Sequence, residues 1–479
     1  MAFRRPSLSP TGWYTIERVT QQVLWIALFA VLAPILGPRP YGLFSIVMVF
    51  IGFSDLILID STSEALITVD ALDHLHTTTA NLANCAIALG CAIVMSALAP
   101  VAGMVFHDDE ITRLIWALAP LPLLAALSAI PIAVLRRSMR YKQLAIRSIV
   151  GLMIGGMCGI AVAFAGGGVW ALALQALAQR LAEVIIVWIS APVRLGVRWS
   201  SRHFNEMRPV GMNVFAARIM IFVSGYVPRV ILGYAVGPTE LGLFSLASRF
   251  LDIILTTTVQ PRSTVGRTEL PRWQPGSPEF TATFARIVQD ASVLSFPLFL
   301  GTAALAPDLF RVWLGERWLP GIASTQLMMI GGLPFVFFYC MDAALLAANL
   351  SSVFRGLAIV QAVTIVATVL CAAPFGLNAT CLALAIRAWV LLPFFMVLAR
   401  RLCHLPIYSF LRLPLRFLMA AVAMGALLAL PLLRTLWLRP EIDLVFCVLL
   451  GLIVYGGIVG SVSRGQLKAL LAGFFVSRS

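Results

Sequence analysis

Long apolar runs recur along almost the whole chain, and no other feature limits the possible folds so strongly. Each run is about 20 residues long, the length that an α-helix needs to cross the hydrocarbon core of a bilayer. Of the 479 residues, 60% are hydrophobic and 12% are charged, so a soluble core could not bury the apolar surface. We therefore predict an all-α polytopic membrane protein with about 14 transmembrane helices. The predicted helices cover residues 19–36, 41–59, 80–105, 112–135, 148–165, 169–190, 211–236, 241–260, 286–306, 322–348, 353–373, 377–399, 414–433 and 442–461.

The basic residues are divided unevenly between the two ends of these helices. If the N-terminus is cytoplasmic, 24 of the 35 Lys and Arg residues fall in cytoplasmic segments, five lie within helices and six remain outside. Cytoplasmic loops accumulate basic residues, so this division predicts that both termini are cytoplasmic. The basic loops would then face anionic head groups, which accounts for the net charge of +14 without a nucleic-acid partner.

A short motif occurs twice, as GPRPYGLFS at 37–45 and GPTELGLFS at 237–245, with an offset of 200 residues. Around it, residues 18–50 align without gaps to 218–250, and ten of the 33 positions are identical. Each repeat holds six helices and starts on the cytoplasmic side, so we predict two parallel repeats related by an axis along the membrane normal. The predicted divisions are an N-terminal lobe over 1–205, a C-terminal lobe over 206–402, and two additional helices with a tail over 403–479.

The repeated motif also predicts a local structure. Proline cannot continue the first helix of each repeat, and glycine adopts backbone dihedrals that are closed to other residues. We expect a helical hairpin on the outer face in both repeats.

Three segments in order resemble the polysaccharide-transport family of oligosaccharide flippases. These are LGPRPYGLFS in the first hairpin, RRSMRYKQLA after the fourth helix, and LGERWLPG at 314–321 before the tenth. The family belongs to the superfamily that includes multidrug antiporters and lipid II flippases. The resemblance implies a V-shaped protein with six helices per lobe around a central cavity. It also implies that the protein moves undecaprenyl-diphosphate-linked oligosaccharide repeat units from the cytoplasmic to the outer leaflet of a bacterial inner membrane, for lipopolysaccharide or exopolysaccharide assembly, alongside polymerase and export partners.

Charged residues inside membrane helices are candidates for binding the cargo, because each costs at least about 2.5–3.5 kcal/mol on insertion scales. The arginines within predicted helices are Arg180, Arg218, Arg229, Arg249 and Arg387. Arg180 has Glu183, and Arg249 has Asp252, three residues further on, so ion pairs compete with a binding role for these two. Arg229 follows Pro228 near an outer helix end, where snorkelling accounts for it.

Arg387 is harder to explain as a structural residue, because only apolar side chains lie three or four positions away on its own helix. It needs a carboxylate from another helix or an anionic cargo. Arg18 and Arg218 occupy equivalent positions in the two repeats, which would place two guanidinium groups about one axis. Guanidinium binds phosphate oxygens in a bidentate manner, so we predict that these arginines contact the diphosphate.

Two other classes of function remain open. A cation-coupled multidrug antiporter of the same superfamily would need carboxylates in the membrane, for which Asp55 and Asp342 are the candidates. Asp55 has no basic residue three or four positions away, and we regard it as a candidate for ion coupling as well as a hydrogen-bonded structural carboxyl. A membrane polysaccharide polymerase or assembly component would need a sizeable outer loop, and the longest ones, near 306–321 and 433–441, are short.

The sequence carries no pattern for an enzyme. It has only two lysines and no GxxxxGK[ST] loop, no HExxH and no GxSxG. Asp70, Asp73, His74 and His76 could be read as a metal site, but no further well-spaced ligand follows and a solvated polar loop is favoured. We therefore expect a transporter without a metal or cofactor.

Overall fold

The computed structural model describes residues 9–57, 66, 73–191, 193, 196–430 and 440–462, and these residues form helices and no strand. By packing, the chain divides into two compact units, Met1–Gly242 and Leu243–Ser479. This division follows compactness, whereas the boundaries predicted at 205/206 and 402/403 follow the repeat and stay predictions.

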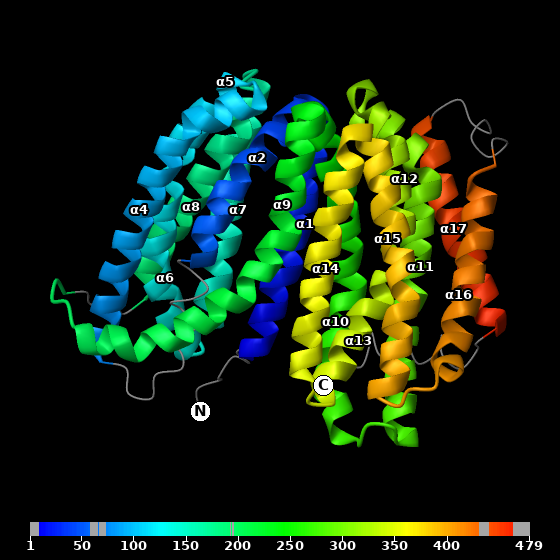
Figure 1. The fold of residues 1–479 in the computed structure, drawn as a ribbon. Helices are drawn as coiled ribbons and strands as arrows, with labels where there is room; N and C mark the ends of the chain where they lie inside the picture. The colour runs from blue at the N-terminus through cyan, green and yellow to red at the C-terminus, as the bar shows by residue number, and fades with distance from the viewer. Residues whose placement is uncertain are drawn as a thin grey trace, which may run out of the picture. The chain divides into compact units, whose positions relative to one another are not determined.

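The first unit is a bundle of long helices in which α7 packs against both α1 and α8, while α4 packs against α5 and α6 (Figure 1). Its elements are α1 (Pro10–Leu36), α2 (Pro38–Asp55), α4 (His74–Phe106), α5 (Asp109–Leu118), α6 (Leu121–Arg137), α7 (Tyr141–Phe164), α8 (Trp170–Ser190) and the part of α9 (Ser201–Ile254) that ends at Gly242.

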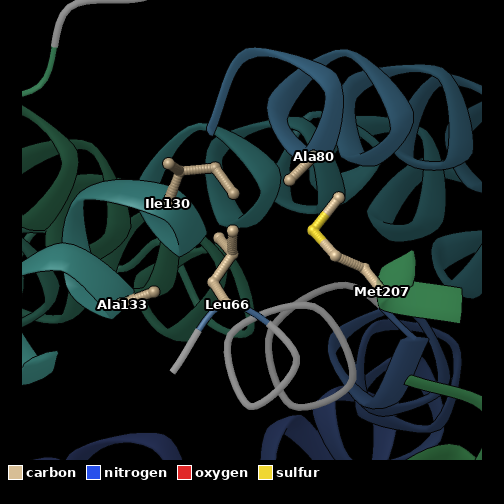
Figure 2. Packing of buried hydrophobic residues seen from close by; sticks show 5 residues of the cluster. All are labelled: Leu66, Ala80, Ile130, Ala133 and Met207. Carbon is tan, nitrogen blue, oxygen red and sulfur yellow. The ribbon is translucent and has the colours of Figure 1, made fainter. Parts of the chain in front are cut away.

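The first turns of α9, drawn in green, run across the ends of α4 and α6 before the helix changes direction (Figure 1). A small core holds them there: Leu66, Ala80, Ile130, Ala133 and Met207 are at most 5% exposed and are turned toward one another (Figure 2). Burying a methionine or isoleucine side chain in this way contributes about 1.5–3 kcal/mol. The start of α9 is therefore fixed to the first unit.

The second unit is built around α11, which packs against α16, α12 and α17, and around α15, which packs against α12 and α14. Its elements after α9 are the π-helix η2 (Leu255–Val259), α10 (Gln260–Glu269), the 3₁₀-helix η3 (Leu270–Arg272), α11 (Pro278–Leu309), the π-helix η4 (Phe310–Leu314), the 3₁₀-helix η5 (Glu316–Gly321), α12 (Ile322–Gly332), α13 (Phe335–Ala347), α14 (Ser351–Ala372), the 3₁₀-helix η6 (Ala373–Phe375), α15 (Leu377–Leu402), α16 (Ile407–Leu428) and α17 (Pro440–Val462).

Eleven helical stretches of the described residues are long and apolar enough to cross a membrane. Fourteen predicted segments correspond to eleven stretches because two segments are not among the eleven and two others share one stretch. Segment 41–59 overlaps α2, which is not among the eleven, and segments 211–236 and 241–260 share the single stretch Arg218–Arg272. Segment 414–433 overlaps the shorter apolar helix Pro414–Leu428. The prediction of many apolar helices is confirmed, and the count of 14 crossings stays a prediction.

The two copies of the repeated motif adopt the same backbone. Gly37 has φ 75° and ψ −179°, and Gly237 has φ 84° and ψ 172°, a region that is open to glycine almost alone. The expected break between two helices is thus present in both. α1 ends before Gly37, and α9 is interrupted at Gly237.

The helices that follow these breaks cross at glycines. A Cβ added to Gly42 would lie 1.7 Å from the carbonyl oxygen of Pro238, and one added to Gly242 would lie 1.9 Å from that of Pro38. Only a residue without a Cβ permits this approach of two backbones. The contacts are reciprocal, because each glycine meets the proline of the other motif.

Candidate functional site

The structure brings Arg180 and Asp55 together, although 125 residues separate them in the sequence. Arg180 Nη2 donates to Asp55 Oδ2 at 3.0 Å, between α8 and α2. The predicted pair with Glu183 is also present, with Arg180 Nη1 and Glu183 Oε2 4.0 Å apart. One guanidinium thus lies between two carboxylates.

Three polar residues follow one another at intervals of one helical turn on α8, and glycines of α7 make room for them. They are Gln175, Gln179 and Glu183. Gln179 Nε2 donates to Glu183 Oε1 at 3.0 Å. A Cβ at Gly151 would lie 2.5 Å from Glu183 Cγ, and one at Gly155 would lie 2.6 Å from Gln179 Cβ. Close approach at small residues is a common way to pack membrane helices, and here it encloses a polar stripe.

A second polar group, centred on a buried serine, joins α7 to α1. Arg147 Nη2 donates to Ser148 Oγ at 2.9 Å, and Ser148 Oγ donates to Glu17 Oε1 at 2.7 Å. Ser148 is fully buried. The i, i+4 spacing of glycines on α7 and of polar residues on α8 is the signal in the sequence that could have pointed to this interior.

Arg387 has a different environment in the second unit. Its Nη1 donates to Thr364 Oγ1 at 3.0 Å and to the carbonyl oxygen of Gln361 at 3.4 Å, both on the adjacent helix α14 (Figure 1). Its Nε is buried without a hydrogen-bond partner, and no carboxylate of the described residues lies within 4.0 Å of the guanidinium. The acidic partner that the sequence interpretation considered is therefore not found among these residues, and the positive charge is met by neutral oxygens only.

The remaining candidate arginines lie nearer the protein surface. Arg18 is exposed on α1, where its Nε donates to Tyr14 Oη at 3.2 Å and its guanidinium lies 5.3 Å from the Tyr14 ring centroid. Arg218 is exposed and Arg249 is half-buried, both on α9. Their proposed contact with a cargo stays a prediction.

The polar residues at the start of α4 serve as a helix cap and a surface contact. Asp73 and His76 form a capping box, in which His74 N donates to Asp73 Oδ1 and Asp73 N donates to His76 Nδ1. His76 Nε2 lies 3.2 Å from Glu206 Oε2 on α9. This contact, followed by that of Arg202, lowers the pKa of Glu206. Asp70 lies outside the described residues, within which no group of three metal-ligating side chains is found.

The described helices, eleven of them long and apolar enough to cross a membrane, define a class of protein, the polytopic membrane proteins. Comparison with known sequences narrows the class, because residues 31–323 match the polysaccharide biosynthesis protein family. This match covers more than half of the chain, and the chain belongs to that family.

Two curated relatives are similar over much of their length. The chain is 22% identical over 320 residues to the succinoglycan biosynthesis transport protein ExoT of Rhizobium meliloti (strain 1021), an alignment that covers 64% of this chain and 62% of ExoT. It is 19% identical over 347 residues to the lipopolysaccharide biosynthesis protein WzxC of Escherichia coli (strain K12), covering 70% of this chain and 68% of WzxC.

Solved structures share the fold. The lipid II flippase MurJ in an inward closed conformation superposes with a TM-score of 0.76 at 13% identity, covering 95% of this chain and 99% of that one. An inward-facing multidrug resistance MATE family transporter of the MOP superfamily superposes with a TM-score of 0.61 at 13% identity, covering 85% and 99%. The predicted resemblance to proteins of polysaccharide transport is confirmed by the family and by the curated relatives. Among these relatives and neighbours, ExoT is named as a transport protein, MurJ as a flippase and the MATE protein as a transporter, as expected for a transporter rather than an enzyme.

Proposed function

We propose that the protein is a flippase for lipid-linked oligosaccharides. It moves undecaprenyl-diphosphate-linked repeat units from the cytoplasmic to the outer leaflet of a bacterial inner membrane, where a polymerase and export machinery use them for lipopolysaccharide or exopolysaccharide. Family membership and the flippase fold support this assignment. The uneven distribution of basic residues supports the orientation with both termini in the cytoplasm.

The observation that carries the proposal is the environment of Arg387. Its Nη1 is held by α14, which leaves the edge formed by Nε and Nη2 for another group. That edge matches two phosphate oxygens, and a diphosphate would supply the negative charge that the described neighbours lack. The Nε atom is covered in this structure, so the cargo has to displace the groups that cover it.

The charges of the first unit favour this cargo over a drug cation. Asp55 is engaged by Arg180, so it is not an open carboxylate for a positively charged drug. In the proposed mechanism Arg18, Arg218 and Arg249 also contact the diphosphate. Arg180 contacts it only when it leaves Asp55, and proton or sodium binding to Asp55 would accompany that release.

The membrane potential supplies a direction for transport. A diphosphate carries about two negative charges, and a potential that is negative inside favours their outward movement by roughly 4–5 kcal/mol per 100 mV. We propose that this term drives net export.

Alternating access requires the outer hairpins to separate. We propose that the reciprocal contact of Gly42 and Gly242 is the closed state of the outer side. Gly42→Ala and Gly242→Ala would each push two backbones apart, because neither carbonyl can move as a flexible side chain can. Both variants should hold the outer side open, which faster labelling of cysteines placed at Arg39 and Thr239 in a cysteine-free background would show. Unchanged labelling would contradict this role.

The function is tested by transport of the cargo itself. A deletion strain should accumulate lipid-linked repeat units on the cytoplasmic leaflet, whereas loss of a polymerase would leave single units already outside. In proteoliposomes that contain these units, Arg387→Ala should abolish translocation and Arg387→Lys should restore it in part, because a point charge cannot reproduce the planar fork. Full activity of Arg387→Ala would refute the role given to this residue.

A further inference from the structure

A pocket of about 400 Å³ lies at the turn between α10 and α11 in the second unit, and neither Arg180 nor Arg387 lines it. Its volume falls within the range of small-molecule sites, about 300–1,000 Å³. The residues that line it are Glu269, Arg272, Trp273, Ala282, Thr283 and Arg286. In the topology predicted from the basic residues, this turn is on the cytoplasmic side, where the cargo is loaded.

The side chains of the pocket combine an aromatic surface with donors and an acceptor. Trp273 is 43% exposed as a residue, and within the described residues its indole N–H has no hydrogen-bond partner. Arg286 Nη2 pairs with Glu269 Oε2 across the pocket wall. Arg272 forms no salt bridge with a described carboxylate. The pocket thus offers an indole surface, a guanidinium group and a carboxylate.

This combination fits a sugar ring better than a phosphate alone. The C–H groups on one side of a pyranose can pack against the indole, while its hydroxyls find donors and an acceptor in the arginines and the carboxylate. A bare diphosphate would use mainly Arg272, because Arg286 is already paired with Glu269, whereas a sugar would also use the indole surface.

The turn that carries Trp273 is held in place without a ligand. Trp273 N donates to the carbonyl oxygen of Leu270 at 3.1 Å, and Ser277 Oγ caps α11 by accepting from Phe280 N at 3.1 Å. Gly276 has φ 86°, a backbone conformation that favours glycine. A Cβ added to Gly276 would lie 3.0 Å from His404 Cβ. A pre-organised turn lowers the entropy that binding would otherwise cost.

We propose that this pocket is a carbohydrate subsite that holds one sugar of the lipid-linked cargo before translocation. The proposal rests on the function proposed above and extends it. The pocket in the second unit would bind the glycan, and the arginines in the membrane would bind the diphosphate. Selection among glycans then takes place at the cytoplasmic surface.

The test compares two ligands that differ only in the sugar. Lipid-linked repeat units extracted from the deletion strain and undecaprenyl diphosphate are each titrated into the purified full-length protein in nanodiscs. Trp273→Ala should weaken binding of the repeat unit about tenfold, the equivalent of about 1.4 kcal/mol, and leave binding of undecaprenyl diphosphate unchanged. Trp273→Phe should retain most of the affinity, since it keeps an aromatic surface.

Trp199 provides a matched control. Its side chain is 50% exposed, it precedes α9 on the side predicted to be cytoplasmic, and its N–H donates to Ser201 Oγ at 3.1 Å. Trp199→Ala should affect neither ligand. Equal losses for both ligands with Trp273→Ala would mean that Trp273 is a membrane anchor or part of a lipid headgroup site, and would overturn the subsite.

The outcomes also separate this proposal from the function on which it rests. If the wild-type protein bound and translocated the repeat unit while Trp273→Ala bound it with unchanged affinity, only the subsite would be wrong. If the wild-type protein bound neither ligand, the proposed cargo itself would be wrong and the subsite with it.

Discussion

Arg180 and Arg387 both lie on apolar helices, yet the protein surrounds them in opposite ways. Arg180 lies 3.0 Å from Asp55 and 4.0 Å from Glu183, so its charge is compensated within the first unit. Arg387 has a threonine hydroxyl and a backbone carbonyl on α14 as its only partners among the described residues. A charge in a membrane helix is costly, so the first arrangement compensates the charge inside the protein, and the second is the one that we propose to bind an anionic ligand.

The largest effect that separates the two arginines should be on stability. Arg180→Ala removes the guanidinium that Asp55 and Glu183 share and should destabilise the protein by about 3 kcal/mol, the low end of the range for broken buried pairs, because the Arg180 side chain is 23% exposed and that of Asp55 31%. Arg387→Ala removes an uncompensated cation and should leave the melting temperature unchanged or raised. Melting in detergent of the two variants checks this.

Transport should show the reverse order once folded protein is compared at equal amounts. Arg387→Ala should lose activity completely, and correctly folded Arg180→Ala should retain part of it. If Arg180→Ala proves as stable as the wild-type protein but inactive, Arg180 belongs to the cargo site and the contrast between the two arginines fails.

Double-mutant cycles should give the next largest difference. The energies of Arg180→Ala and Asp55→Ala should be coupled by about 1–3 kcal/mol, because each removes the partner of the other. The matched cycle combines Arg387→Ala with Thr364→Val and tests the single hydrogen bond from Arg387 to a neutral hydroxyl. The coupling energy in this cycle should be smaller than that between Arg180 and Asp55. Equal coupling in both cycles would show that Thr364 holds Arg387 as firmly as a carboxylate holds Arg180.

A smaller effect should follow from filling the space that α7 leaves for Glu183. Gly151→Ala places a methyl group 2.5 Å from Glu183 Cγ and should cost about 1 kcal/mol, the low end for overpacking, because a side chain can shift where a backbone cannot. Gly90→Ala is the control, because an added Cβ there meets no atom within 4 Å. Thermal melting of both variants in the same detergent gives the comparison. A neutral Gly151→Ala would mean that Glu183 can leave its position without loss.

The sequence predicted the helices and the repeated turn because both follow from local rules. Runs of apolar residues require helices in a bilayer, and glycine before proline interrupts a helix wherever it occurs. The absence of a carboxylate near Arg387 on its own helix was also readable, since i, i+4 spacing is local. The two compact units are defined by packing, which does not depend on where a sequence repeat begins or ends. The predicted lobe boundaries and the predicted cargo contacts of the arginines therefore stay predictions.

The pairing of Arg180 with Asp55 could not be read in the same way. It joins α2 to α8 across 125 residues, and the choice of partner depends on how the helices pack. The same holds for the contact of Arg147, Ser148 and Glu17, in which Ser148 and Glu17 are 131 positions apart. Local spacing can show that a charge needs a partner, but the partner is set by tertiary structure.

The smallest effect should come from a carboxylate at the protein surface, where water weakens the interaction between paired charges. Glu206 on α9 contacts His76 and Arg202, and these contacts lower its pKa below the usual value near 4.5. A carboxylate with a lowered pKa in the folded state stabilises that state above its unfolded pKa, and the contribution is lost as the pH falls through the folded value. The start of α9 should therefore loosen only below about pH 4.5, and Glu206→Gln should remove this dependence. Fluorescence of Trp199, measured from pH 7 to pH 3 against a Trp199→Phe background, would report the change, and water around the exposed Glu206 keeps it small. A transition centred well above the unfolded pKa in wild-type protein would assign the loosening to another group. The contacts of Glu206 would then not contribute to holding the start of α9.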